Sequence, residues 1–359
     1  MGLNRKGRFF RKGIERLERF DARGAARAFL AGMRREECSR SADWFPYTLL
    51  LRSRYRELSE ALKTKPRTGY TSYSDWWFRF MTGEIDALPA ATEGMLESDN
   101  YFLRIYGVWR WSKRSGIRDA SDALREKTAR GGLTFEMHLE EKRAGVYLAL
   151  LEGNAPNAAK YAWANLREYP NHSETLVDLF EALSASGETA ATRALLDEKA
   201  VKRLANRDLR VKYLSSRERY RLGDYAGAIR DLHRLLLEFR HHPLFRYNLG
   251  NAHYARGEKL RALISWEEAA RCAPLFERAW YNAGTICQEA GDVEHAATQL
   301  SEAVRLGKRA DAIYNLSVSC IERKELDAAY YHLARLPEEG GKYGAEAIRA
   351  RIRELLVRS

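Results

Sequence analysis

The stretch YNLGNAHYARGEKLRAL, residues 247–263, decides the fold of this 359-residue chain, because its pattern recurs. YNAGTICQEAGDVEHAA begins 34 residues later at Tyr281, and YNLSVSCIERKELDAAY begins 33 residues after that at Tyr314. The first stretch holds no nucleophile–base pair, metal-ligand spacing or phosphate-binding loop. A period of this size is typical of repeat architectures, in which each unit buries its apolar face on the next one.

A turn residue followed by a polar residue marks the repeat along the chain. The clearest turns are at Gly153, Gly187, Gly223, Gly257, Gly291 and Lys324, with spacings of 34, 36, 34, 34 and 33 residues, and fainter ones are at Gly83 and Gly116. Glycine suits the left-handed residue that ends a helix, and a following Asn or acid can cap the next helix. Each unit is therefore predicted to be two antiparallel helices of roughly 12–15 residues, neither of them stable alone in water.

One such unit resembles the tetratricopeptide repeat (TPR), a helical hairpin with a 34-residue period and small side chains where its two helices cross. Gly250 and Gly284 stand at the crossing position of the first helix. Ala262, Ala296 and Ala329 stand at the corresponding position of the second helix. Small side chains at both positions let the two backbones approach closely.

The resemblance is closest over about 209–341, looser over 139–208 and loosest before residue 139. Upstream, Trp76 and Trp109 fall where the repeat has glycine, so helical hairpins of a looser type are expected there. Within this region the segment YTLLLRSRYRELSEAL is expected to form one helix.

The resemblance implies an all-α fold, a right-handed superhelical α-solenoid of about nine or ten helical hairpins. Composition agrees with a folded helical protein, because hydrophobic residues make up 45% of the chain and there are only 8 prolines. The expected parts are a basic N-terminal region of degenerate repeats (1–68), aromatic-rich degenerate hairpins (69–138), a TPR-like array (139–341) and a C-terminal capping helix (342–359).

No pattern of catalytic or metal-binding residues emerges, so we expect no enzyme activity, no metal and no cofactor. His241 and His242 are read as the capped end of a helix near Pro243, since no H-x-x-x-H or H-E-x-x-H spacing exists. The cysteines have no C-x-x-C spacing and are read as reduced, mostly buried thiols: Cys38, Cys272, Cys287 and Cys320. Reduced thiols, and the lack of an apolar run of about 20 residues, favour a cytoplasmic protein.

Two aromatic stretches, SYSDWWFRFM (72–81) and YFLRIYGVWRWSKR (101–114), carry four of the eight tryptophans. Rings interspersed with Arg can stack on bases or peptides. The interpretation we favour is that these rings fill the core between the irregular hairpins, with some ring edges at a binding surface as the alternative.

The N-terminal part of the chain carries most of the net charge of +12. Residues 1–67 hold 18 Lys/Arg and 8 Asp/Glu, a difference of +10. Phe10, Ile14, Leu17 and Phe20 form one helical stripe in this segment. We interpret it as an ordinary first helix that packs its stripe on the array. The alternative is a helix that binds nucleic acid or an anionic membrane surface.

The resemblance implies a non-catalytic scaffold that holds a protein or peptide partner in the concave groove of the array. The groove positions lie on the first helix of each unit, and the candidates are Tyr213, Arg217, Tyr247, Asn248, Asn251, Tyr254, Arg278, Tyr281, Asn282, Tyr314 and Asn315. An Asn amide matches the donor and acceptor of a peptide unit, and the two arginines suit an acidic partner. Alternatively, the asparagines of this set tie neighbouring units together; we call Asn248, Asn251, Asn282 and Asn315 the Asn row.

The alternative function is binding of nucleic acid or an anionic membrane surface through residues 1–67. The sequence leaves the partner and the oligomeric state open.

Overall fold

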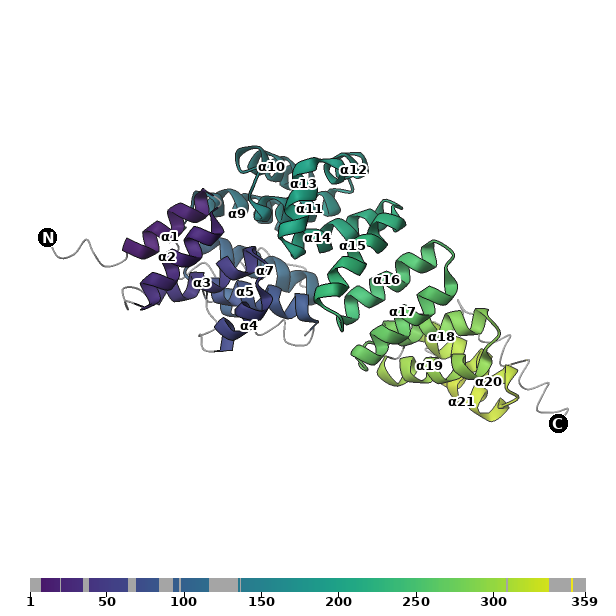
Figure 1. The fold of residues 1–359 in the computed structure, drawn as a ribbon. Coiled ribbons are helices and arrows are strands. Elements are labelled where there is room, and N and C mark those ends of the chain that lie inside the picture. The colour runs from purple at the N-terminus through teal and green to yellow at the C-terminus, as the bar shows by residue number, and fades with distance from the viewer. Residues whose placement is uncertain are drawn as a thin grey trace. The chain divides into compact units, whose positions relative to one another are not determined.

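The computed structural model in Figure 1 is helical throughout the residues that it describes. These are residues 8–19, 21–34, 39–63, 69–83, 93–96, 98–115, 135, 137–307, 309–335 and 350. They form no β-strand, as the repeat pattern predicts. The chain divides into two compact units between Asp224 and Tyr225. This division falls within the array expected over 139–341, at the turn after Gly223.

The first unit contains irregular N-terminal hairpins followed by repeat-like hairpins. Its helices are α1 (Arg8–Glu18), α2 (Ala22–Arg34), α3 (Ser39–Leu51), α4 (Tyr55–Lys63), α5 (Gly69–Thr82), α7 (Tyr101–Ser115), α9 (His138–Leu151), α10 (Ala155–Glu168), α11 (Ser173–Ser186), α12 (Thr189–Asp197), α13 (Lys199–Arg207) and α14 (Leu209–Arg221). The second unit contains α15 (Tyr225–Glu238), α16 (Pro243–Ala255), α17 (Lys259–Cys272), α18 (Glu277–Glu289), α19 (Val293–Leu306), α20 (Ala310–Glu322) and α21 (Leu326–Ala334).

The predicted turns adopt the left-handed conformation that ends a helix. Lys324 has φ 62°, and the glycines at the other repeat turns have φ between 74° and 81° in Gly153, Gly187, Gly223, Gly257 and Gly291. After two of these turns, Asn154 and Asp292 accept a hydrogen bond from the helix backbone, as the capping argument predicts. Glu188 and Glu258 form no side-chain cap, so the acid after the turn caps only some of the helices.

The small residues lie where the two helices of a hairpin meet. A Cβ atom on Gly250 would stand 2.5 Å from the Trp266 ring, and one on Gly284 would stand 2.7 Å from Leu300 Cγ. Ala262 and Ala296 are fully buried on the facing helices. These contacts confirm the close crossing that the repeat pattern predicts for α16 with α17 and for α18 with α19.

Two segments differ from the sequence prediction. The stretch expected to form one helix, residues 47–62, instead breaks at Ser53, which has φ 50° and separates α3 from α4. No glycine marks this turn, so the turn pattern does not predict it. In the repeat that follows Gly187, the second helix is split at Glu198 into α12 and α13, which accounts for the longer 36-residue spacing.

The basic first helix packs as an ordinary first helix. Phe10, Ile14 and Leu17 are buried, and Phe10 lies against the rings of Phe29 and Trp44. Phe20 lies outside the described residues, as does the capping helix expected over 342–359 apart from its residue 350. Within the described ranges, no helix has the length and apolar character needed to cross a membrane.

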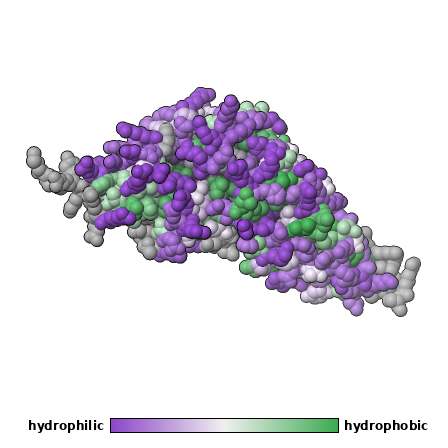
Figure 2. Space-filling model, in the orientation of Figure 1, coloured by the Kyte–Doolittle hydropathy of each residue, from purple (hydrophilic) through white to green (hydrophobic). Residues whose placement is uncertain are grey.

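The surface of the second unit mixes charged side chains with isolated apolar ones, and Figure 2 shows hydrophobic areas between hydrophilic ones there. Leu260 and Ile264, one turn apart on α17, are both exposed.

Candidate functional site

The predicted groove residues lie at fixed distances before the turn that ends each first helix. Tyr213 and Arg217 lie on α14 of the first unit, and the other candidates lie on α16, α18 and α20 of the second. Tyr247, Tyr281 and Tyr314 all stand ten residues before their turn, and the following Asn stands nine before it. The same register places residues of α9, α11 and α14 at the equivalent positions of the first unit.

In the second unit, part of the Asn row joins neighbouring helices. The Asn282 amide donates to the Tyr247 hydroxyl at 3.3 Å and to the Asn251 side-chain oxygen at 3.4 Å. Trp266 Nε1 donates to the same Asn251 oxygen at 3.0 Å. Asn251 and Asn282 therefore tie α16, α17 and α18 together, which agrees with the structural interpretation of these two residues.

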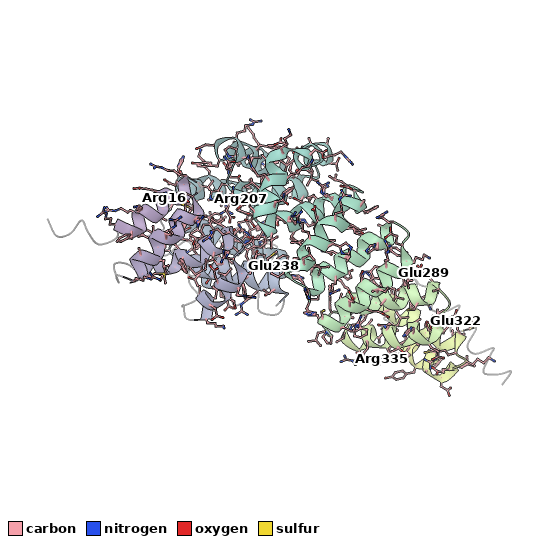
Figure 3. All side chains as sticks on the ribbon, in the orientation of Figure 1. Arg16, Arg207, Glu238, Glu289, Glu322 and Arg335 are labelled. Atoms are coloured by element: carbon pink, nitrogen blue, oxygen red, sulfur yellow. The ribbon has the colours of Figure 1, made fainter. Side chains whose placement is uncertain are left out.

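Three other candidate groove residues keep a polar group without a described partner or an exposed ring. Asn248 is half-buried, and no described residue hydrogen-bonds its amide. Arg278 is exposed and forms no ion pair with a described carboxylate. Tyr254 is 44% exposed, with its ring 5.7 Å from that of Trp266 and its hydroxyl 3.4 Å from Glu289, which Figure 3 labels. Asn248 and Arg278 therefore leave polar groups available to a partner on this unit, and Tyr254 adds an exposed ring whose hydroxyl contacts Glu289.

The face continues onto the next helices. The Tyr281 ring lies under the Arg309 guanidinium at 4.5 Å from its centroid, and Arg309 also pairs with Asp311 at 2.5 Å. The Gln288 amide donates to the Asn315 backbone carbonyl at 3.1 Å, which joins α18 to α20. Tyr314 and the Asn315 side chain are half-buried.

In the first unit the chain's own helix α5 contacts first-helix residues that stand thirteen and ten places before their turns. Tyr70 donates to Glu140 on α9, and Tyr73 donates to Glu174 on α11 at 2.7 Å. Farther along, Phe80 packs against Tyr213 on α14 with ring centroids 5.1 Å apart. Successive turns of one face of α5 thus contact the first helices of three successive repeats.

Beneath α5 lies a network of fully buried charges, which we call the buried ion network: Arg143, Glu174, Asp178, Asp208 and Arg210. Arg143 pairs with Glu174 and with Asp178, each at 2.7 Å. Arg210 pairs with Glu174 at 2.8 Å and with Asp208 at 2.6 Å. Glu174 thus bridges two arginines that belong to different repeats.

The network fixes the charge state of Glu174. Burial alone would raise the pKa of this carboxyl, but the Arg143 and Arg210 guanidinium groups and the Tyr73 hydroxyl lower it to about 2. Glu174 is therefore ionised at neutral pH and cannot act as a general base poised near pH 7. The arrangement is that of a structural junction between repeats.

The two predicted groove residues of the first unit belong to this closed face. Tyr213 is buried against Phe80. Arg217 lies 3.4 Å from Glu181 and 3.1 Å from Glu218. Glu181 also lies 3.4 Å from Arg110, whose guanidinium stacks 4.4 Å over each of the Trp76 and Trp109 rings.

The sequence alone does not predict the buried ion network or the helix that covers it. The signal that was present is the register itself, because Arg143 and Tyr213 stand ten residues before their turns, where the second unit has Tyr247. The aromatic stretches are buried, as the favoured interpretation predicts, with Trp76, Trp77 and Trp109 each no more than 7% exposed.

The described histidine and cysteine side chains that were candidates for catalysis or metal binding fit structural roles. His242 is buried, and its Nδ1 accepts from the Phe245 amide at 3.2 Å, so it caps α16. Cys287 and Cys320 are buried, and burial raises the pKa of the Cys287 thiol to about 11. Cys38 lies outside the described residues. The described residues contain no group of three His, Cys, Asp or Glu side chains that could hold a metal ion.

Comparison with known proteins identifies the fold. No family model matches the chain, and no curated protein matches it. The chain is similar to one in the crystal structure of the APC/C hetero-tetramer Cut9–Hcn1, with a TM-score of 0.52 and 14% identity over 84% of this chain and 62% of that one. This chain therefore spans less than two thirds of that neighbour.

Shorter TPR structures match about half of the chain. One is YrrB, described as a TPR protein with an unusual peptide-binding site, with a TM-score of 0.41 and 18% identity over 50% of this chain and 91% of that one. Another is MamA from Desulfovibrio magneticus RS-1, with a TM-score of 0.43 and 18% identity over 47% and 94%. The similarity to the Cut9–Hcn1 chain, together with the turn geometry, confirms the TPR-like α-solenoid fold.

Proposed function

We propose that the protein is a non-catalytic interaction scaffold and that the second unit binds a segment of a partner protein on the face formed by α16, α18 and α20. The observation that carries the proposal is the contrast between the two units at one register. In the first unit α5 contacts first-helix residues thirteen and ten places before their turns, namely Glu140, Glu174 and Tyr213. In the second unit Arg278, thirteen places before its turn, and Asn248, nine places before its turn, form no side-chain hydrogen bond or ion pair with a described residue.

The chemistry of this face suits a peptide main chain. Asn248 offers a donor and an acceptor to one peptide unit. Tyr254 adds a rigid ring with a polar tip, a residue type enriched at interfaces. Arg278 offers a fork of donors to a carboxylate. A partner segment that carries an acidic side chain would use all three groups.

The first unit supplies a precedent for how such a face is filled. There the chain itself presents an aromatic helix, and the Tyr73 hydroxyl and the Phe80 ring contact successive first helices. In the proposal, the second unit leaves this role to a partner.

Site-directed photo-crosslinking in the native cell tests the proposal. A benzoylphenylalanine in place of Tyr254 would probe the proposed face, and the same residue in place of Tyr161 on α10 is a matched control. The two tyrosines are similarly exposed, at 44% and 46%. We expect a defined protein crosslinked at position 254 and not at 161, with its yield reduced by Asn248→Ala. Equal crosslinking at both positions would exclude a specific face.

The alternative, in which residues 1–67 bind nucleic acid or an anionic membrane surface, stays a prediction. Its apolar stripe is used in packing, so a contact of this kind would rest on the exposed arginines of α1 and α2.

A further inference from the structure

Three arginines from distant parts of the sequence line one cavity of the first unit. Its volume is about 350 Å³, and it is lined by Asp21, Ala22, Arg23, Leu51, Arg52 and Arg207. Arg23 lies at the start of α2, Arg52 follows α3, and Arg207 ends α13, where Figure 3 labels it. We call this space the arginine cavity. It is distinct from the proposed partner face, which belongs to the other unit.

The positive charge of the arginine cavity is not neutralised by the protein. Arg23, Arg52 and Arg207 form no ion pair with any carboxylate in the described part of the chain. Burial, followed by the charges of Arg54, Arg23 and Arg27, lowers the pKa of the Arg52 guanidinium, so Arg52 is repelled by Arg23 and by two arginines outside the cavity lining. Folding brings like charges together here, which costs stability unless an anion is bound.

The acids near the cavity are already engaged. Asp21 accepts from Arg16 at 2.6 Å and from the Gly24 amide at 2.7 Å, and both bonds lower its pKa. Asp208, behind the cavity, is held by Arg210 at 2.6 Å. Neither carboxylate is free to serve the three arginines.

The wall behind the arginines combines apolar side chains with polar ones. A smaller space of about 40 Å³ shares Ala22, Leu51 and Arg207 with the arginine cavity and adds the side chains of Leu17, Leu204 and His172. Burial lowers the pKa of His172 to about 4, so its ring is neutral at pH 7. The arginines therefore stand in front of a wall of apolar and neutral polar side chains, whose one carboxylate, Asp208, is already paired with Arg210.

We propose that the arginine cavity binds a small phosphate-bearing molecule. Guanidinium groups match phosphate oxygens bidentately, and three of them suit a ligand with two or more negative charges. A single carboxylate would leave two of the three charges uncompensated. The volume lies at the low end of the range for small-molecule sites, about 300–1,000 Å³, and is too small for an extended nucleic-acid strand.

Titration calorimetry with sodium pyrophosphate tests the proposal on the full chain, in chloride buffer at constant ionic strength. We expect saturable binding at one site, weakened about tenfold or more by the double substitution Arg52→Gln with Arg207→Gln. The matched control is Arg167→Gln with Arg234→Gln, two exposed arginines outside the cavity, which removes the same charge. The control should bind as the unchanged chain does.

Stability distinguishes a binding role from a structural one. Because neighbouring arginines repel Arg52, Arg52→Gln should leave the melting temperature unchanged or raise it while it weakens pyrophosphate binding. A fall in melting temperature would mean that Arg52 supports the fold, and would overturn the proposal. So would the absence of saturable binding, or equal binding by the cavity variant and the control.

Two further arms identify the source of the phosphate. A single-stranded RNA and vesicles that contain phosphatidylinositol phosphate are titrated in the same buffer. We expect both to bind more weakly than pyrophosphate, or independently of Arg52 and Arg207. Tighter binding of either, with the same dependence on these arginines, would overturn the small-ligand proposal in favour of a macromolecular surface. None of these outcomes bears on partner crosslinking at Tyr254.

Discussion

The Tyr73 hydroxyl donates a 2.7 Å hydrogen bond to Glu174, and this bond joins helix α5 to a repeat 101 residues farther along the chain. Glu174 in turn bridges Arg143 and Arg210, so one carboxylate connects α5, α9, α11 and α14. The first unit is therefore held together across its repeats, and not only by contacts between neighbouring hairpins.

Removal of the Glu174 charge should destabilise the first unit strongly. Glu174→Gln leaves Arg143 and Arg210 buried without one of their counter-charges, and breaking a buried pair costs about 3–5 kcal/mol. The exposed Glu198→Gln serves as control and should change the free energy of unfolding by less than about 0.5 kcal/mol. Urea unfolding followed by tryptophan fluorescence measures both, and similar midpoints for the two variants would contradict the role given to Glu174.

Glu174 also predicts that the free energy of unfolding falls at acidic pH. The pKa of Glu174 is about 2 in the folded chain, against a reference value of 4.5. A group whose pKa is depressed on folding contributes stability above its unfolded pKa and loses it as the pH falls through the folded value. This contribution, about 3 kcal/mol, should therefore disappear between pH 4.5 and 2. The unchanged chain and Glu174→Gln should approach equal stability at the acidic end, and a constant difference across this range would refute the assignment.

The close helix crossing of the second unit predicts a steric effect. Gly250→Leu would force a side chain into the Trp266 ring, and overpacking typically costs about 1–3 kcal/mol. Ser301→Leu on the exposed side of α19 is the control and should be nearly neutral. Thermal unfolding monitored by circular dichroism compares them, and equal melting temperatures would show that the crossing is not close.

The Asn row separates into structural and free members. Asn282→Ala removes two hydrogen bonds to Tyr247 and Asn251 and should lower the free energy of unfolding by about 1–2 kcal/mol. Asn248→Ala removes no described hydrogen bond and should change it by less than about 0.5 kcal/mol. Denaturant midpoints of the two variants test this difference. If Asn248→Ala were the more destabilising, its side chain would have a structural role.

The sequence predicts the repeated hairpins from Gly153 to Lys324 because their turn signals are local: a left-handed residue followed by a polar one. It fails at Ser53, where a residue other than glycine takes the left-handed conformation. It also fails for α5, because the contacts that define its place join residues far apart in sequence. The aromatic composition of α5 indicates burial but does not indicate which helices bury it.

For the candidate site, too, the sequence predicts local features and misses the contacts between distant segments. Position relative to the turn identifies Tyr247 and Tyr213 as equivalent places on first helices, with Asn248 at the place that follows. Whether such a place is open depends on what covers it, and only the structure shows Phe80 over Tyr213. The Asn251 and Asn282 bonds likewise depend on the spacing between helices.

The most direct test of the central claim compares the affinity of the crosslinked partner for two variants of the chain. Asn248→Ala alters the proposed face of the second unit, and Tyr213→Phe alters the covered face of the first while it keeps the ring that packs on Phe80. Fluorescence anisotropy with the labelled partner segment should show a loss of more than about 1 kcal/mol for Asn248→Ala and no loss for Tyr213→Phe. Unchanged affinity for Asn248→Ala, or an equal loss for both variants, would contradict the assignment of partner binding to the second unit.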